Sequence, residues 1–104
     1  MSVDTGDAAP RQVAVWFVYI IETKCGVYYT GITTDIERRF QEHCDMYAKV
    51  PKAKGAKFFR GHCPSDIVYR EQLADRASAS RREREIKSWS REQKQQLIAT
   101  ARQQ

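Results

Sequence analysis

The feature that most constrains this chain is a run of nine uncharged residues near its N-terminus, from Val13 to Ile21. Both alternating sets of side chains in this run are apolar, whereas a strand with one face in water carries polar residues at every second position. The run therefore predicts a strand that is covered on both faces. A chain of 104 residues is expected to form one domain around such a strand, with a core of modest size.

A second strand is predicted directly after the first. The turn sequence from Glu22 to Gly26 is followed by β-branched and aromatic residues from Val27 to Ile32. If the hairpin is centred on Lys24, Tyr19 lies opposite Tyr29, with both side chains on one face. Two phenols that meet on a sheet form either a packing pair or part of a site, and spacing alone favours packing.

A helix is predicted after the hairpin, because Thr34 and Glu37 have the spacing of a capping box. Its apolar residues recur every four positions, at Ile36, Phe40 and Cys44. Arg39 and His43 flank this apolar stripe, while Arg38 is turned by about 100° and is expected in solvent. An arginine and a histidine would then lie beside the two tyrosines.

Three motifs follow one another along the chain: Val18-Tyr19, Tyr29-Thr30-Gly31 and Arg39. In this order they resemble the signature of the GIY-YIG nuclease family, in particular its small single-domain bacterial members. The family keeps its two tyrosines well apart in sequence, so the aligned pair is Tyr19 and Tyr29 rather than Tyr28 and Tyr29. The resemblance extends over most of the chain.

The resemblance to the family extends roughly from Phe17 to Ile98. Within this range, Phe17 stands where the family usually has its first glycine, and Thr30 stands where it usually has an isoleucine. The fold that the resemblance implies is α/β, a small sandwich with a three-stranded central sheet flanked by helices.

A basic segment at residues 47–62 contains five cations and no acid: Lys49, Lys52, Lys54, Lys57 and Arg60. Pro51 and Gly55 prevent a regular helix through its middle. Its aromatics, Tyr47, Phe58 and Phe59, are expected to pack at the edge of the core. The segment is either a solvated loop or a phosphate-binding one; we favour phosphate contacts for the cations, because five unopposed charges repel one another. A similar Lys-Gly-Ala-Lys stretch precedes the third strand in related small GIY-YIG proteins.

The remaining elements follow the same reasoning. Residues 66–73 predict a third strand in which Ile67 and Tyr69 share a face, and a helix over residues 76–89 starts after Asp75 or Ser78. A last helix is capped by Ser90 and Gln93 and carries Leu97, Ile98 and Ala101. The predicted order is β-β-α-β-α-α within residues 13–102, preceded by a disordered arm at residues 1–12.

Glu83 is the acid that most needs an explanation. On a helical wheel it lies on the same side as Ala79 and Ile86, which faces the sheet. A buried carboxylate without a partner costs several kcal/mol, so Glu83 must be paired, protonated or bound to a cation. An ion pair with Arg39 or Arg82 would satisfy it. The resemblance instead places the metal-binding glutamate of the family at Glu83.

Charge and cysteine content narrow the class of protein. The net charge of +5 favours a polyanionic partner. Three scattered cysteines argue against a disulfide framework, and zinc at the dipeptides His43-Cys44 and His62-Cys63 is disfavoured, because adjacent helical side chains diverge by about 100°. The longest apolar run is far shorter than the roughly 20 residues of a membrane span, and the N-terminus does not resemble a secretory signal. We expect a cytoplasmic protein.

The resemblance implies a metal-dependent DNA endonuclease that hydrolyses phosphodiester bonds with Mg²⁺ or Mn²⁺, on branched or single-stranded DNA and with a role in repair. It assigns roles to Tyr19 as base, Tyr29 in orienting the water, Arg39 on the phosphate, His43 as donor or proton shuttle near the phosphate, and Glu83 as metal ligand.

Two other classes of function remain open. One is a nucleic-acid-binding module that does not cut; the chain contains no asparagine, and many family members carry one near the site. The other is a subunit that depends on a larger DNA-processing protein. A metabolic enzyme is disfavoured, because the chain has no glycine-rich phosphate loop or cofactor motif.

Overall fold

The computed structural model describes residues 14–103, and the arm predicted at residues 1–12 lies outside them. The helices and strands are β1 (Trp16–Thr23), β2 (Tyr28–Thr33), α2 (Ile36–Tyr47), the 3-10 helix η2 (Lys57–Arg60), β3 (Pro64–Leu73), α3 (Arg76–Lys87) and α4 (Arg91–Arg102). Apart from the short η2, their order is the predicted β-β-α-β-α-α. The fold class is therefore confirmed.

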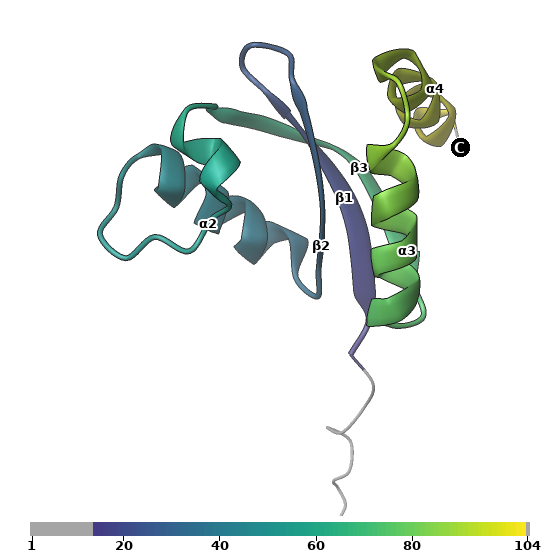
Figure 1. The fold of residues 1–104 in the computed structure, drawn as a ribbon, viewed down its shortest axis with the longest axis horizontal. Helices are drawn as coiled ribbons and strands as arrows, with labels where there is room; N and C mark the ends of the chain where they lie inside the picture. The colour runs from purple at the N-terminus through teal and green to yellow at the C-terminus, as the bar shows by residue number, and fades with distance from the viewer. Residues whose placement is uncertain (1–13, 104) are drawn as a thin grey trace, which may run out of the picture.

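Strand β1 is the middle strand of an antiparallel sheet with the order β2-β1-β3 (Figure 1). Its residues Val18 to Ile21 are at most 1% exposed, which confirms a strand covered on both faces. The predicted start was too early, since Ala14 and Val15 precede the strand and are exposed.

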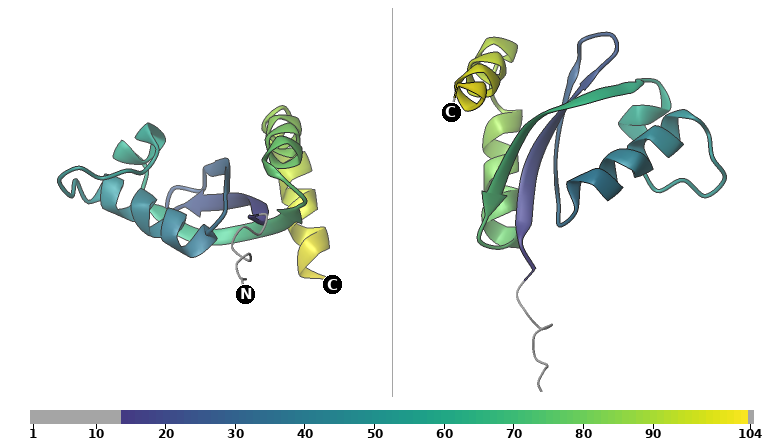
Figure 2. Two further views of the ribbon diagram at one scale, coloured as in Figure 1. Left: turned by 90° about the horizontal axis from the view of Figure 1, so that it is seen from below. Right: turned by 180° about the vertical axis from the view of Figure 1, so that it is seen from behind.

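The alternation of side chains along β1 divides the interior into two cores. The first, which we call the aliphatic core, is made of Val18, Ile20, Val68, Ala79, Ile86 and Ile98. The second, the aromatic core, is made of Tyr19, Ile21, Ile36 and Phe59, with further aromatic side chains packed around it. Helices α3 and α4 lie on the aliphatic side of the sheet and α2 with η2 on the aromatic side (Figures 1 and 2).

The pairing of β1 with β2 differs from the prediction by two residues. Tyr19 lies opposite Gly31, and Tyr29 lies opposite Ile21. A shift of two residues keeps every side chain on its face, so the two tyrosines still share the aromatic side as diagonal neighbours. Their ring centroids are 6.3 Å apart.

The turn explains the shift. The N–H of Thr23 donates to the carbonyl of Val27 at 2.9 Å, and Gly26 adopts a φ of 84°, which favours glycine. The hairpin is therefore centred on Cys25, one residue after the predicted centre at Lys24.

Strand β3 contains an irregularity where it passes the middle of β1. Tyr69 pairs with Ile20 and Ile67 pairs with Ile21, so Val68 is an additional residue between them. Ile67 therefore packs against the aromatic core and Tyr69 against the aliphatic core. The prediction that these two side chains share a face was wrong, because a bulge breaks the two-residue period.

The cap of α2 was predicted one residue too early. Asp35, not Thr34, is the N-cap, and its carboxylate accepts a hydrogen bond from the N–H of Arg38 at 3.1 Å. The N–H of Asp35 in turn donates to the hydroxyl of Thr33 at 3.1 Å. These two bonds fix the direction in which α2 leaves the sheet.

The other two caps agree with the sequence. Asp75, one of the two candidates, accepts from the N–H of Ser78 at 2.8 Å and starts α3. Ser90 and Gln93 form the predicted capping box of α4. Helix α3 ends at Lys87, two residues before the predicted end at Trp89.

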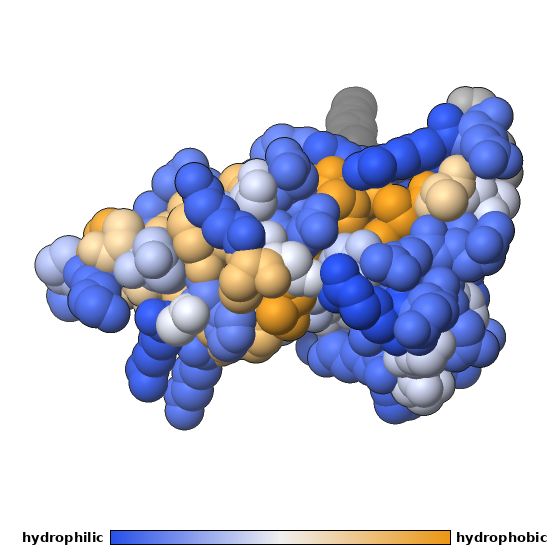
Figure 3. Space-filling model, turned by 90° about the horizontal axis from the view of Figure 1, so that it is seen from above, coloured by the Kyte–Doolittle hydropathy of each residue, from blue (hydrophilic) through white to orange (hydrophobic). Residues whose placement is uncertain are grey.

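On the face in Figure 3, hydrophilic side chains surround smaller hydrophobic patches. Within residues 14–103, no helix has the length and apolar character that crossing a membrane requires.

Candidate active site

Tyr19 and His43 form a buried pair on the aromatic side of the sheet. The Tyr19 hydroxyl lies 2.8 Å from Nε2 of His43, and the two side chains are 1% and 0% exposed. The other ring nitrogen, Nδ1, accepts a hydrogen bond from the backbone N–H of Ala56 at 3.1 Å. A backbone N–H is always a donor, so Nδ1 carries no proton, and a neutral His43 carries its proton on Nε2.

The surroundings of His43 keep it neutral. Burial, with the nearby Arg39 guanidinium as a second cause, lowers the pKa of His43 to about 4. At neutral pH, Nε2 therefore donates to the Tyr19 oxygen. The histidine can stabilise negative charge on that oxygen but cannot take the tyrosine proton, because its only free nitrogen is already bonded to Ala56.

The groups around Tyr19 have opposing effects on its pKa. Burial, the largest cause, and the neighbouring Tyr29 raise its pKa, and the Arg39 guanidinium offsets this only in part, so the pKa of Tyr19 lies above its usual value. The hydroxyl lies against the backbone of Gly31, where a Cβ atom would stand 2.5 Å from the oxygen. Only glycine at position 31 leaves room for this tyrosine in its observed position.

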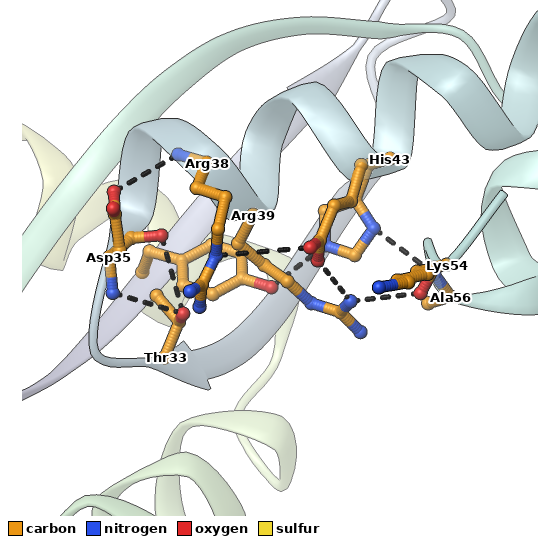
Figure 4. Close-up of polar contacts among 9 residues, drawn as sticks. Thr33, Asp35, Arg38, Arg39, His43, Lys54 and Ala56 are labelled. Carbon is orange, nitrogen blue, oxygen red and sulfur yellow. Dashed lines mark hydrogen bonds and ion pairs between the residues drawn. The ribbon is translucent and has the colours of Figure 1, made fainter.

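Arg39 leaves α2 on the same side as His43 and reaches the basic segment (Figure 4). Its Nη1 donates to Glu42 Oε1 at 2.7 Å and to the carbonyl of Lys54 at 2.9 Å. The side chain is 28% exposed, so part of the guanidinium faces solvent. A guanidinium held in this way has further donors for an anion that approaches from outside.

Tyr29 is half-buried on the edge strand β2. Its ring centroid lies 4.8 Å from that of Phe59, 5.3 Å from Phe58 and 5.4 Å from His43. The Lys87 ammonium, from α3, lies 6.0 Å from the Tyr29 ring centroid. Tyr29 thus stands between α2 on one side of the sheet and α3 on the other.

Glu83 is 21% exposed, and its carboxylate pairs with Lys87 at 3.1 Å. The predicted alternative partners are engaged elsewhere: Arg39 pairs with Glu42, and Arg82 pairs with Glu71 and Glu85. The alternative of an ion pair with Arg39 or Arg82 is therefore not what the structure shows. Lys87 follows Glu83 by four residues on the same helix, and this spacing could have identified it as the partner from the sequence.

The structure brings the predicted site residues together to different degrees. Tyr19, Tyr29, Arg39 and His43 form one continuous cluster. Glu83 lies at its border, close enough to raise the pKa of Tyr19 and linked to Tyr29 through Lys87. The site therefore lies around the edge strand β2, and helices α2 and α3 both contribute residues to it.

The five cations of the basic segment are all exposed, and none forms an ion pair with another described residue. Lys49, Lys52 and Arg60 line a concavity of about 410 Å³. The segment is tied to the site through its backbone, at the carbonyl of Lys54 and the N–H of Ala56. Of its predicted core aromatics, Phe58 and Phe59 pack in the aromatic core, whereas Tyr47 is exposed.

A metal ion at this site would have one protein carboxylate. In the part of the chain that the structure describes, no three His, Cys, Asp or Glu side chains lie together as a metal site. Glu83 alone fits Mg²⁺, which keeps several waters and takes phosphate oxygens of the substrate as further ligands. The partly exposed pair of Glu83 with Lys87 is weak enough to be exchanged for a cation.

Sequence reasoning missed three contributors to this site: Glu42, Ala56 and Lys87. Glu42 follows Arg39 by three residues on α2, and this spacing could have identified it. The N–H of Ala56 leaves no signal in the sequence, because every residue except proline has one.

Comparisons with known proteins identify a family. The sequence model of the GIY-YIG catalytic domain matches residues 15–96, a stretch that contains all five predicted catalytic residues. A UPF0213 protein of Photorhabdus laumondii is 41% identical over 83 residues, covering 80% of this chain and 73% of the relative. UPF0213 protein YhbQ of Escherichia coli K12 is 40% identical over 84 residues, covering 81% of this chain and 77% of the relative.

A solved structure is similar as well. A UPF0213 protein of Bacillus halodurans, determined by NMR in solution, has a TM-score of 0.50 to this chain at 36% identity. The likeness covers 83% of this chain and 84% of that protein.

Proposed function

The chain belongs to the family of GIY-YIG catalytic domains, a nuclease family, and from this premise we propose that it is a metal-dependent DNA endonuclease. The observation that carries the proposal is the cluster around Tyr19. A buried phenol receives a hydrogen bond from His43 and has the Arg39 guanidinium beside it. This combination is costly in a protein core and useful where a phenol must release its proton near a phosphate.

We assign the phosphate to Arg39. A guanidinium binds two oxygens of one phosphate, and Glu42 with the carbonyl of Lys54 holds this guanidinium in place. When phosphate oxygens take up some of its donors, Arg39 still lies close enough to Tyr19 to favour loss of the tyrosine proton.

Tyr19 would first release its own proton to solvent as the DNA binds, and the phenolate would then accept a proton from the attacking water, which Tyr29 orients. His43 acts on Tyr19 rather than on the phosphate, because it is fully buried and donates to the tyrosine oxygen. The new phosphorus–oxygen bond forms from the water as the bond to the leaving oxygen of the sugar breaks.

Glu83 would hold the divalent cation, Mg²⁺ or Mn²⁺. When bound, such a cation supplies positive charge beside the phosphate and the leaving oxygen. Lys87 would leave Glu83 and remain near Tyr29, where its charge also faces the phosphate side of the site.

The basic segment would hold the DNA backbone on either side of the cut, through Lys49, Lys52, Lys54, Lys57 and Arg60. If it does, removing the charge of Lys52, Lys54 and Lys57 weakens binding to all sequences and flattens its salt dependence. An unchanged salt dependence would reject this segment as a contact surface.

A second candidate is a DNA-binding module that does not cut, alone or as a subunit of a larger DNA-processing protein. It is favoured by the 1% exposure of Tyr19, which keeps the proposed base from solvent, and by the pairing of Glu83 with Lys87, which occupies the proposed metal ligand. In this case DNA binding is tight and salt-sensitive, and a Glu83→Ala variant binds as the wild type does.

The deciding experiment is a nicking assay on supercoiled plasmid and on branched and single-stranded oligonucleotides, with Mg²⁺, Mn²⁺ or EDTA. Wild type is compared with Glu83→Gln and Arg39→Ala, each checked for folding by circular dichroism. We expect metal-dependent cleavage that both substitutions abolish. Full metal-dependent nicking by Glu83→Gln would contradict the assignment of Glu83.

A further inference from the structure

A second concavity, of about 260 Å³, lies at the other end of α2 from the basic segment. The start of β1, the end of β2, the N-terminal part of α2 and the start of α3 line it, with Trp16, Thr34, Arg38, Arg39, Glu42 and Arg76 among its residues. Three arginines face one carboxylate in this small space, which we call the arginine concavity. It was not predicted from the sequence, because its residues come from four separate elements.

The charge of the arginine concavity is not neutralised from within. Its carboxylate, Glu42, is already bonded to Arg39 at 2.7 Å and lies 3.8 Å from Arg38. Arg76 forms no ion pair with any residue of the described range 14–103. Guanidinium groups that retain free donors are suited to phosphate oxygens.

The same concavity contains a flat aromatic surface. The guanidinium of Arg76 lies over the half-buried Trp16 ring, 5.6 Å from its centroid. A nucleobase stacks on an indole or on a guanidinium plane in the same way. The concavity therefore combines the two surfaces that one unpaired nucleotide requires, cations for its phosphate and a plane for its base.

Its position relates it to the candidate active site. Arg39 lines the concavity and also belongs to the cluster around Tyr19. On α3, Arg76 precedes Glu83 by seven residues, which places both on the same side of the helix and about 10 Å apart along its axis. A strand that places one phosphate at Arg39 and Glu83 thus reaches the concavity with the adjacent nucleotide.

We propose that the arginine concavity binds the nucleotide next to the scissile phosphate of a DNA strand, with its phosphate on Arg38 and Arg76 and its unpaired base on the Trp16 ring, which the Arg76 guanidinium uncovers when it turns from the ring to the phosphate. This inference rests on the proposed nuclease function. It selects a substrate class, because a base can stack on Trp16 only where it is not paired in a duplex. The substrates are single-stranded DNA and junctions that have unpaired nucleotides.

The chain offers a direct reporter for this contact, since it has two tryptophans. Trp89 lies outside the concavity and is covered by the Arg82 guanidinium at 5.3 Å. In a Trp89→Phe, Glu83→Gln protein, Trp16 is the sole tryptophan and the DNA stays intact. We expect a single-stranded oligonucleotide to quench its emission, and a blunt duplex to leave it unchanged. The matched Trp16→Phe, Glu83→Gln protein, which keeps Trp89, should show no quenching.

Two arginine substitutions on α3 then test the phosphate contact. Arg76→Ala in the reporter protein should weaken single-strand binding about tenfold, as expected for one charge-assisted hydrogen bond. Arg81→Ala removes the same charge from an exposed position outside the concavity and should leave binding almost unchanged. Both proteins are checked for folding by circular dichroism.

The outcomes separate this inference from the nuclease assignment. Binding by fluorescence anisotropy without a change in Trp16 emission would overturn the inference and leave the nuclease function intact. Quenching of Trp16 in a protein whose wild type never cleaves DNA would support the concavity and reject the nuclease function. Absence of all DNA binding would overturn both.

Discussion

The two faces of β1 are built from neighbouring residues of one strand, yet they differ in almost every property. The side of Val18 and Ile20 is an aliphatic core that α3 and α4 cover. The side of Tyr19 contains rings, a buried histidine and an arginine that bonds to a loop. One face thus has the composition of a packing surface, and the other has buried polar groups that packing alone does not require.

This difference teaches where to look for chemistry in a small domain. The buried side chains of the aliphatic core stabilise the fold and include no reactive group, and Glu83 of α3 lies outside this core. On the aromatic side, Tyr19 and His43 are buried and cost free energy unless their polar atoms are all bonded. If stability and activity are divided between the faces, substitutions on each side should have opposite effects.

The largest expected effect is on cleavage. Tyr19→Phe should reduce the single-turnover cleavage rate about 10²- to 10⁴-fold, the range for loss of a general base. It also leaves Nε2–H of His43 without a partner, which costs about 1–3 kcal/mol of stability. The control is Tyr28→Phe, the same chemical change on the other face of the sheet, where Tyr28 packs against the aliphatic core. Equal loss of activity in both variants would break the division between the faces.

The next effect belongs to the aliphatic side. Ile20→Ala should lower the free energy of unfolding by about 2–5 kcal/mol, because it leaves a cavity at a side chain that is fully buried. The rate of cleavage by the folded fraction should remain that of the wild type. Urea unfolding gives the first quantity and a single-turnover assay the second, and a large loss of activity in folded protein would contradict the comparison.

The contribution of the aromatic core to the free energy of unfolding should depend on pH through His43, and the contribution of the aliphatic core should not. The pKa of His43 is lowered to about 4 in the folded protein from 6.5 when it is exposed, with burial as the main cause. Between these two pH values, His43 is protonated in the unfolded chain but neutral in the native protein. The free energy of unfolding therefore decreases as the pH falls from about 6.5 to about 4. The loss approaches about 3 kcal/mol at the lower end.

His43→Gln removes this titration while keeping a donor for Tyr19. Urea unfolding between pH 7 and pH 4.5 should therefore show a smaller decrease in stability for the variant than for the wild type. Parallel decreases would mean that His43 does not cause the pH dependence, and that the carboxylates do.

The fold was largely predictable from the sequence, because it depends on patterns that repeat. The uncharged run through Val18 and Ile20 identified the central strand, and the capping box at Ser90 identified the last helix. The residues shared with the family identified which tyrosines lie together. Each of these signals is carried by several positions at once, so an error at one of them does little harm.

What failed depends on single local choices. The turn closes around Cys25 because Gly26 adopts a positive φ, and this moved the register by two residues. A bulge at Val68 separated the faces of its two neighbours. The bond from Ala56 to His43 joins a loop to a helix, and no periodic pattern reports such a contact.

The smallest predicted effect comes from a pair of substitutions that make the same chemical change, threonine to valine, once on each face of the sheet. This pair gives the most direct comparison of the two faces. Thr30 lies opposite Ile20 on the aliphatic side, where its buried hydroxyl finds no hydrogen-bond partner among residues 14–103. Thr30→Val replaces that hydroxyl with a methyl group of similar size and should raise the free energy of unfolding by about 1 kcal/mol.

The control is Thr33→Val on the aromatic side, whose equally buried hydroxyl accepts from the N–H of Asp35. This substitution should lower stability by about 1–3 kcal/mol, because it leaves that N–H without a partner at the start of α2. Opposite signs for the same chemical change, measured by urea unfolding, would establish that a polar group is tolerated on this sheet where it is bonded. Equal signs would mean that the unbonded hydroxyl of Thr30 costs the fold nothing, and the contrast between the two faces would then not extend to their threonines.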